Sequence, residues 1–179
     1  MSMSAMAAET FPFEGAVELW DGEEVVKGQP TPSHEAIRAQ VIVQLSAQCP
    51  PGLSIRVSSA VGDDRNCAQS DGSVVDVTSQ PRCTPVWVEV LSTSDLRGDA
   101  RLTAQRRRRF LFDNGVAGLW VFLYHYGTIT LTVHHADGTV EAFASPGEVT
   151  LPVRHSGGER NVTIDLGAIE AAAQQAGEE

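Results

Sequence analysis

Lysine is nearly absent from this chain of 179 residues: Lys27 is the only one, and the other basic side chains are arginines and five histidines. The formal net charge is −10 at pH 7. Proteins that coat nucleic acids without selectivity rely on clustered Lys and Arg, which release counterions from phosphates, so the composition excludes that class. Four arginines are nevertheless consecutive, Arg106 to Arg109. Such a run is either a solvated helix face or a surface for phosphate or a partner, and both interpretations stay open.

Paired cysteines and long apolar runs are lacking as well. Cys49, Cys67 and Cys83 are an odd number without CxxC spacing, which indicates free thiols in a reducing compartment and argues against zinc. No apolar run approaches the roughly 18 residues of a membrane span, and residues 1–10 lack the basic start and apolar core of a signal peptide. We therefore expect a cytoplasmic protein that does not contact a membrane.

With 42% hydrophobic residues, the chain can bury a core as one domain. We expect a disordered tail over residues 1–13 and a single domain over residues 14–176. Apolar periodicity and turn signals predict an α/β (α+β) protein, in which Ile37, Val41 and Leu45 form one helical stripe against a sheet. Strands are expected at 17–20, 24–27, 53–61, 74–75, 86–91, 119–124, 128–134, 139–144 and 148–153, and helices from Ser33 to before Pro50, at 96–114 and at 169–176.

The sequence has no GxSxG elbow, no P-loop, no GxGxxG after a strand and no Cys/His nucleophile pair, which leaves the carboxylates. Side chains alternate along a strand, so Glu89 shares a face with Trp87 and Leu91, while the neighbouring valines point the other way. Burying an unpaired carboxylate costs at least several kcal/mol, so Glu89 needs a cation, a proton or a hydrogen-bond donor. Two interpretations stay open: a Mg²⁺ site shared with Asp71, or an ion pair with an arginine of the next helix.

One member of the arginine run is expected to face the sheet. Leu102, Arg106 and Phe110 lie at four-residue spacing on one helix face. Arg106 is therefore expected to point toward Glu89, and the next two arginines to lie on other faces. Among the histidines, His34 opens the first helix and is a site candidate, whereas the other four are expected at the surface.

Several segments, taken in order, carry a family resemblance. Val88-Glu89-Val90-Leu91-Ser92 matches a Val-Glu-Val-Leu-Ser signature, and Ser70-Asp71-Gly72 matches a Pro-Asp motif with serine in place of proline. Asp99 falls where an aspartate usually follows the signature. Further matches are Leu19-Trp20-Asp21-Gly22-Glu23, Pro32-Ser33-His34, Gly115-Val116 and Leu119-Trp120. Over about residues 14 to 170 the chain thus resembles the Uma-type restriction endonuclease family, within the PD-(D/E)XK nuclease superfamily.

This resemblance implies a restriction-endonuclease-like mixed β-sheet flanked by helices, with a site that hydrolyses phosphodiester bonds in DNA. The implied cofactor is Mg²⁺ or Mn²⁺, held by Asp71 and Glu89, which would polarise the phosphate and activate a water molecule. Asp76, which lies inside the apolar run, is the alternative to Asp71 as the first ligand.

The family's lysine, which positions the attacking water, has no counterpart here, because Leu91 occupies its place. Arg106 is expected to supply the positive charge instead, and Gln105 could orient a water weakly. Two hypotheses follow. The chain is a nuclease with altered catalysis that contacts DNA through the region from Arg106 to Arg109, or it is a binding or assembly module whose acids pair with arginines. A second copy of the chain, in a homodimer, is a further candidate partner.

Overall fold

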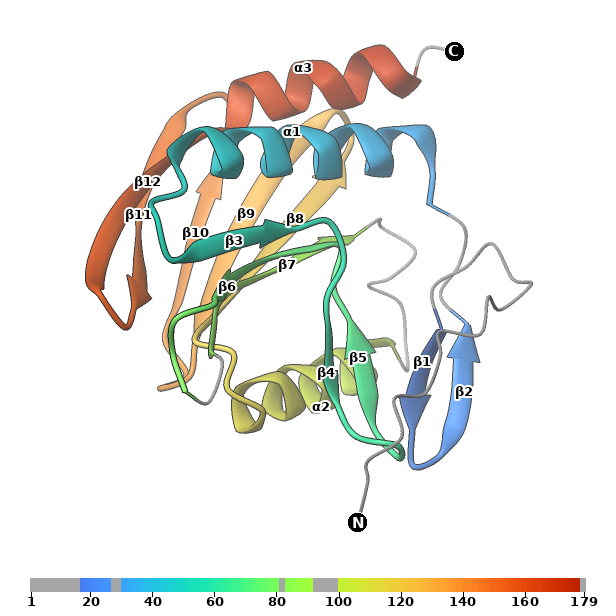
Figure 1. Cartoon of the computed structure of the whole chain (residues 1–179). Coiled ribbons are helices and arrows are strands. Elements are labelled where there is room, and N and C mark those ends of the chain that lie inside the picture. Colours follow the sequence, from blue (N-terminus) through green and yellow to red (C-terminus); the bar gives the residue numbers. More distant parts are fainter. Residues whose placement is uncertain (1–16, 27–29, 81–82, 92–99, 178–179) are drawn as a thin grey trace.

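Figure 1 shows the fold as a computed structural model, which describes residues 17–26, 30–80, 83–91 and 100–177. The expected tail, residues 1–13, lies outside these ranges. In chain order, the helices and strands are β1 (Val17–Trp20), β2 (Glu23–Val26), α1 (Pro32–Gln48), β3 (Leu53–Arg56), β4 (Ala60–Gly62), β5 (Cys67–Gln69), β6 (Gly72–Asp76), β7 (Cys83–Leu91), α2 (Ala100–Asp113), β8 (Gly118–His125), β9 (Thr128–His135), β10 (Val140–Ala144), β11 (Glu148–His155), β12 (Gly158–Asp165) and α3 (Leu166–Gly177).

The main sheet has six strands in the order β10-β9-β8-β7-β6-β3. Strands β7 and β8 run parallel, with α2 in the connection between them, and the other neighbouring strands are antiparallel. The sheet is therefore mixed, as predicted, and β8, β9 and β10 form an antiparallel meander in it. The strands predicted at 74–75 and 86–91 lie within β6 and β7, which are antiparallel neighbours inside this sheet.

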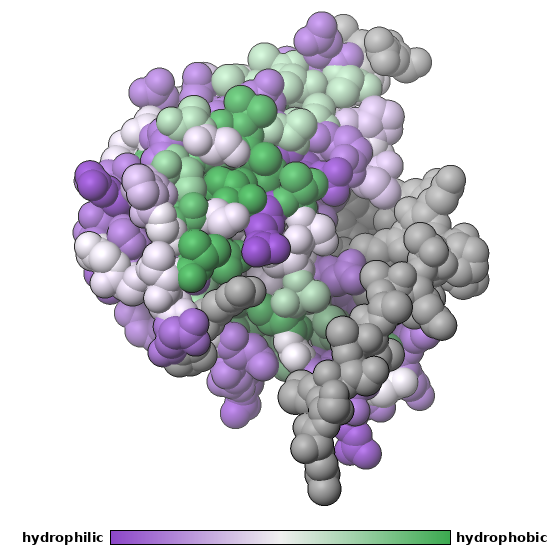
Figure 2. All heavy atoms as spheres, in the orientation of Figure 1, coloured by the Kyte–Doolittle hydropathy of each residue, from purple (hydrophilic) through white to green (hydrophobic). Residues whose placement is uncertain are grey.

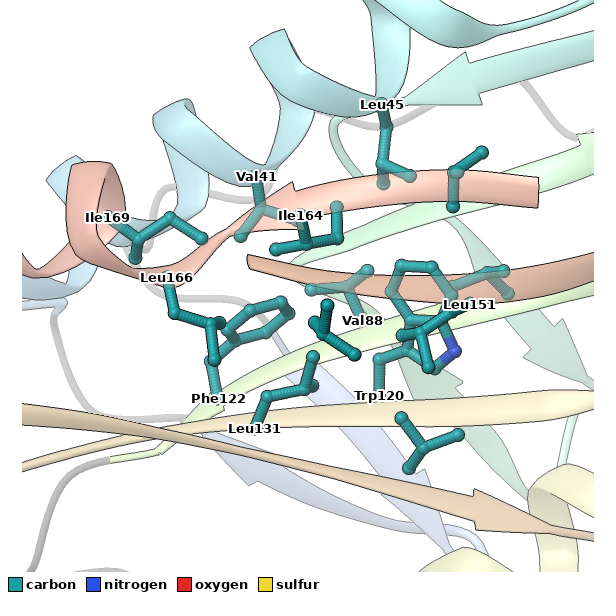
Figure 3. Packing of buried hydrophobic residues seen from close by; sticks show 14 of the residues in the cluster. Val41, Leu45, Val88, Trp120, Phe122, Leu131, Leu151, Ile164, Leu166 and Ile169 are labelled. Atoms are coloured by element: carbon teal, nitrogen blue, oxygen red, sulfur yellow. The ribbon is translucent and has the colours of Figure 1, made fainter. Parts of the chain in front are cut away.

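Helices α1 and α3, with the hairpin of β11 and β12, cover one face of the main sheet (Figure 1). Thr31 caps α1, because its side-chain oxygen accepts a hydrogen bond from the His34 N–H at 3.2 Å. The stripe predicted for α1 is confirmed, since its three apolar side chains are all buried. Figure 3 shows Val41 and Leu45 pointing into this core, which also contains Val88, Phe122, Leu131, Ile164 and Leu166.

Helix α2 and a small sheet, in the order β2-β1-β5-β4, lie on the opposite face (Figure 1). There Trp87 and Leu119 of the main sheet pack with Leu111 of α2 and Ala68 of β5. Because side chains alternate along β7, Glu89 lies on this face with Trp87, while the intervening valines belong to the core under α1. The predicted facing of Glu89 is therefore correct.

Residues 53–70 differ from the prediction of one strand followed by a polar loop. Strand β3 ends at Arg56 in the main sheet, whereas β4 and β5 form a hairpin in the small sheet. The Asp63 carboxylate holds the hairpin turn, since it accepts hydrogen bonds from the N–H groups of Arg65 and Asn66 at 2.9 and 2.8 Å. The apolar alternation runs on through residues 53–61, so periodicity alone could not reveal that the chain changes sheets there.

The surface carries apolar side chains on the face formed by α1 and β3, as Figure 2 shows. Exposed valines of this region include Val43 on α1 and Val57 directly after β3. Scattered single valines are ordinary on protein surfaces and need no functional explanation. Within the ranges that the structure describes, no helix combines the length and the hydropathy needed to cross a bilayer.

Candidate functional site

Asp71 directly precedes β6 and lies against the middle of β7. Its backbone N–H donates a hydrogen bond to the Val88 carbonyl at 3.1 Å, and its Oδ2 accepts one from the Val90 N–H at 2.7 Å. These two bonds flank Glu89 along β7, so the Asp71 carboxylate is fixed beside that residue. Asp71 is only 9% exposed, and the charge-assisted bond from the Val90 amide stabilises its ionised form.

Glu89 is buried in β7, with 6% of its surface exposed. Its Oε1 accepts a hydrogen bond from the indole Nε1 of Trp87, two residues earlier on the same face. The same oxygen forms an ion pair with Arg107 Nη2 at 2.7 Å. Of the two interpretations left open by the sequence, the structure therefore shows the ion pair with an arginine of the next helix.

Arg107 on α2 bridges Glu89 and a second buried acid, Glu18. Its Nη1 lies 2.6 Å and 2.8 Å from the two oxygens of Glu18, and its Nη2 also donates to the Gln69 carbonyl at 2.6 Å. Burial lowers the pKa of this guanidinium, but nearby negative charges outweigh burial and raise the pKa above its ordinary value. These charges come from Glu89, Glu18 and Asp71. Arg107 is therefore a permanently charged group at the centre of three carboxylates.

Glu18 was not singled out by the sequence, although it is 3% exposed. It lies on β1, where its Oε1 accepts a hydrogen bond from the Gln69 N–H at 3.0 Å and its Oε2 accepts one from Trp20 Nε1 at 3.2 Å. The local signal was the same as for Glu89: an acid between apolar residues of a strand, two positions from a tryptophan. The sequence placed Glu18 on the expected strand at 17–20 and gave no indication of what that strand packs against.

The prediction that Arg106 faces Glu89 is wrong. Arg106 Nη2 instead pairs with Asp21 at 2.8 Å, and its side chain is 54% exposed. Its guanidinium lies 5.4 Å from the Trp20 ring centroid, and the Phe110 ring packs on the same tryptophan at 5.2 Å. The helix face that carries Arg106 and Phe110 is therefore turned toward the β1–β2 hairpin.

Arg107, the next residue along α2, occupies the position that faces the main sheet. Leu111, four residues after Arg107, is fully buried, so these two side chains share the face turned toward β7. Consecutive side chains of a helix point about 100° apart, so Arg106 faces the β1–β2 hairpin whereas Arg107 faces the main sheet. The prediction also relied on Leu102, whose side chain is not among those that the structure describes.

Asp76 lies at the far end of β6. It is paired with Cys83 at the start of β7, six residues from Glu89, which corresponds to roughly 20 Å along the strand. The structure thus places Asp71, rather than Asp76, beside Glu89. The Asp76 carboxylate accepts hydrogen bonds from Thr78 N (2.9 Å), Thr78 Oγ1 (2.7 Å), Ser79 N (3.1 Å) and Ser156 N (2.7 Å). It therefore fixes the turn after β6 to the β11–β12 hairpin.

Replacing Asp76 with asparagine is expected to destabilise the protein at neutral pH. Hydrogen bonds from Ser156, and then from Thr78, hold the pKa of Asp76 well below its ordinary value. A carboxyl group whose folded pKa is depressed stabilises the fold above its unfolded pKa of about 3.9, and this stabilisation is lost as the pH falls below that value. The difference in free energy of unfolding between wild type and Asp76→Asn should therefore narrow below about pH 4.

Urea unfolding at neutral and acidic pH measures this difference. Asp64→Asn is the matched control, because Asp64 is exposed in the β4–β5 turn. Two results would contradict the role assigned to Asp76. One is an equal loss in free energy of unfolding for the two variants at neutral pH, and the other is a difference between wild type and Asp76→Asn that does not change on acidification.

The remaining candidates divide between the site and other places. His34 Nε2 lies 3.5 Å from Asp71 Oδ2, so the first turn of α1 contributes to the site. Helix α1 passes close to Asp71, because a Cβ added to Gly72 would lie 2.7 Å from Ile42 Cδ1. Gln105 is exposed on α2 and lines a different groove. Asp99 lies outside the described residues.

The residues at the site fit a hard cation in part. Proteins bind Mg²⁺ through one or two carboxylates together with water and substrate phosphate, and Asp71 and Glu89 supply such oxygen ligands. Over residues 17–26, 30–80, 83–91 and 100–177, no three His, Cys, Asp or Glu side chains are grouped so as to hold a metal ion. Arg107 competes directly for Glu89 Oε1. A cation at this position therefore requires Arg107 to share or to leave Glu89.

Comparison with solved structures identifies the class of fold. The fold is similar to that of the crystal structure of a "putative nuclease belonging to DUF820" from Anabaena variabilis ATCC 29413. That structure matches this chain with a TM-score of 0.68 and 15% sequence identity, covering 90% of this chain and 93% of the other. The chain therefore has a nuclease-like fold. No family model and no curated protein matches its sequence.

Proposed function

We propose that this protein is a divalent-metal-dependent nuclease that hydrolyses phosphodiester bonds in DNA. The observation that carries the proposal is the pair of buried carboxylates: Glu89 in β7, and Asp71, which directly precedes the neighbouring strand β6 and is fixed against β7. Burying two acids costs free energy, and such groups cluster at functional sites as well as in structural ion-pair networks. The nuclease-like fold of the Anabaena variabilis protein supports the same class of reaction.

The side chains present define what each would contribute. Asp71 and Glu89 would hold Mg²⁺ or Mn²⁺, which supplies Lewis-acid activation of a phosphate and of water when bound. Arg107 keeps its proton and can stabilise negative charge on a phosphate, but it cannot act as a general base. His34, whose Nε2 lies 3.5 Å from Asp71 Oδ2, is placed to hold a proton beside that carboxylate.

A second candidate function rests on the ion pair between Arg107 and Glu89. Its 2.7 Å contact, together with the pair between Arg107 and Glu18, already supplies positive charge to the buried acids. A protein in which arginine permanently replaces the metal would keep the fold and bind nucleic acid without cutting it. The departure at Leu91, where related nucleases have lysine, favours this alternative.

Metal dependence of DNA cleavage tests the proposal. Wild-type protein incubated with supercoiled plasmid is expected to nick it in Mn²⁺ or Mg²⁺, and not in EDTA, because both carboxylates need the cation to act on phosphate. Asp71→Asn protein, purified identically, controls for contaminating nucleases and is expected to be inactive. Cleavage at the same rate by wild type and Asp71→Asn would reject the site. Binding of DNA by wild type without any metal-dependent cleavage would favour the non-cutting module.

A further inference from the structure

The four consecutive arginines of α2 have different surroundings. Arg106 pairs with Asp21, Arg107 with two glutamates, and Arg109 with Asp113 at 3.8 Å. Arg108 differs, because no carboxylate of the described residues lies within 4.0 Å of its guanidinium. In a protein with a net charge of −10, a partly buried arginine without an acidic partner is a candidate anion contact.

Arg108 lines an open groove of about 290 Å³ between α2 and the end of the β9–β10 hairpin. We call it the α2–β9 groove; its polar lining residues include Gln105, Arg108, Arg109, His134, His135 and Thr139. Arg108 Nη1 lies 3.2 Å from His134 Nδ1, and because an arginine can only donate, His134 accepts at this nitrogen. The groove therefore presents a guanidinium whose remaining N–H groups are available for acceptor oxygens.

Two arginines, Arg108 and Arg109, and one acid, Asp113, line the groove. Burial first, and then the charges of Arg108 and His135, lower the pKa of His134. Asp113, which also lines the groove, and Glu141 are each paired with a basic residue of the lining. Asp113 pairs with Arg109, and Glu141 contacts His135 Nε2 at 3.0 Å.

The α2–β9 groove and the buried acids lie on the same face of the main sheet. Leu119 of β8 is paired with both Trp87 of β7 and His134 of β9, so these three residues form one row across the sheet. Glu89 lies two residues further along β7. With neighbouring strands about 4.8 Å apart and a rise of about 3.3 Å per residue, the backbones of Glu89 and His134 are roughly 12 Å apart. A single strand of nucleic acid is long enough to reach both places.

We propose that the α2–β9 groove binds a phosphate group through Arg108. This inference rests on the proposed nuclease function for the source of that phosphate, which is the backbone of a DNA strand whose neighbouring part reaches Asp71 and Glu89. Arginine suits this role, since its planar fork can contact two phosphate oxygens at once. The groove adds a backbone contact that positions the strand and carries no sequence information.

Two binding measurements in EDTA test the inference without any need for metal or cleavage. Inorganic phosphate is expected to shift the NMR signals of the His134 ring in wild type and not in Arg108→Gln. For a short fluorescent DNA duplex, Arg108→Gln should raise Kd roughly three- to fivefold at fixed salt and reduce the slope of log K against log salt by about one. Arg154→Gln removes the same charge from an exposed position on the β11–β12 hairpin and should change neither quantity.

Arg108→Lys is the control for a loss of binding that comes from misfolding rather than from loss of the positive charge. A lysine still binds phosphate as a point charge, so this variant should keep the duplex affinity within about twofold of wild type. Wild-type duplex affinity in Arg108→Gln would overturn the assignment to DNA, even if phosphate still shifts the His134 signals. Absence of both responses in wild type would overturn the phosphate site itself. Failure of the proposed nuclease function would appear separately, as absent Mn²⁺-dependent cleavage with normal duplex binding.

Discussion

Replacing Arg107 with alanine is expected to lower the free energy of unfolding by about 3–5 kcal/mol, the cost of removing one partner from a buried ion pair. The variant leaves Glu18 and Glu89, which are 3% and 6% exposed, without the guanidinium that contacts both. It also removes a donor from the Gln69 carbonyl. Because Arg107 joins β1, β5 and β7 to α2, its loss should loosen the small sheet against the main sheet.

Urea unfolding at neutral pH measures this loss, and two further variants sharpen it. Arg109→Ala is the matched control. The Arg109 side chain is 86% exposed, and its Nε lies 3.8 Å from Asp113 Oδ2, which makes a weak surface ion pair. This variant should change the free energy of unfolding by less than about 0.5 kcal/mol. Arg107→Lys keeps the charge but cannot reproduce the fork between two glutamates, so an intermediate loss is expected. Equal losses for Arg107→Ala and Arg109→Ala would contradict the bridging role.

The pH dependence of this contribution has a definite sign. The folded pKa of Arg107 is raised above its ordinary value, so the guanidinium contributes stability at every pH below its unfolded pKa and loses it only as the pH rises through the folded value. Titration of Arg107 should therefore add no slope to stability near neutral pH. The same property means that a pH–rate profile of any cleavage should show no limb from Arg107.

The alternation of side chains along the strands was enough to predict most of the fold. Alternation along residues 86–91 was sufficient to place Glu89 opposite the valines, because a strand has a side-chain period of two and burial on both faces leaves little freedom. The register of β6 and β7, which shifts between Val74 and Asp76, was not predicted by this pattern. The hairpin of β11 and β12 was only half predicted, since Val162 and Ile164 alternate with polar residues over a stretch that begins with charged Glu159 and Arg160.

The contacts of Arg107 were harder to predict from the sequence. Its partners lie 89 and 18 positions away, at Glu18 and Glu89, and such contacts depend on how the small sheet docks. The rotation of α2 is set by Leu111 in the core and by Phe110 against Trp20. Spacing of four residues fits both the Arg106 and the Arg107 faces, so periodicity could not choose between them.

Replacing Glu89 with glutamine is expected to weaken Mn²⁺ binding roughly a hundredfold or more, because even residues that only orient metal ligands cost 10–100-fold when changed. Cleavage should fall by about a thousandfold, since loss of the cation removes several kcal/mol of transition-state stabilisation. Glutamine keeps the shape of Glu89 and an oxygen that can accept from Trp87 and Arg107, so the fold should survive. Calorimetric Mn²⁺ titration and the plasmid assay measure the two effects.

Glu18→Gln is the control that separates a metal ligand from an acid that merely pairs with Arg107. Both substitutions remove one negative charge from the same guanidinium, with contacts of 2.6 Å to Glu18 and 2.7 Å to Glu89. Only Glu89 lies on the strand beside Asp71, so Glu18→Gln should weaken Mn²⁺ binding slightly, as Arg107 then stays closer to Glu89. Equal losses in the two variants would show that the acids act through Arg107 alone. Such a result would favour the non-cutting module, in which the arginine has taken the place of the cation.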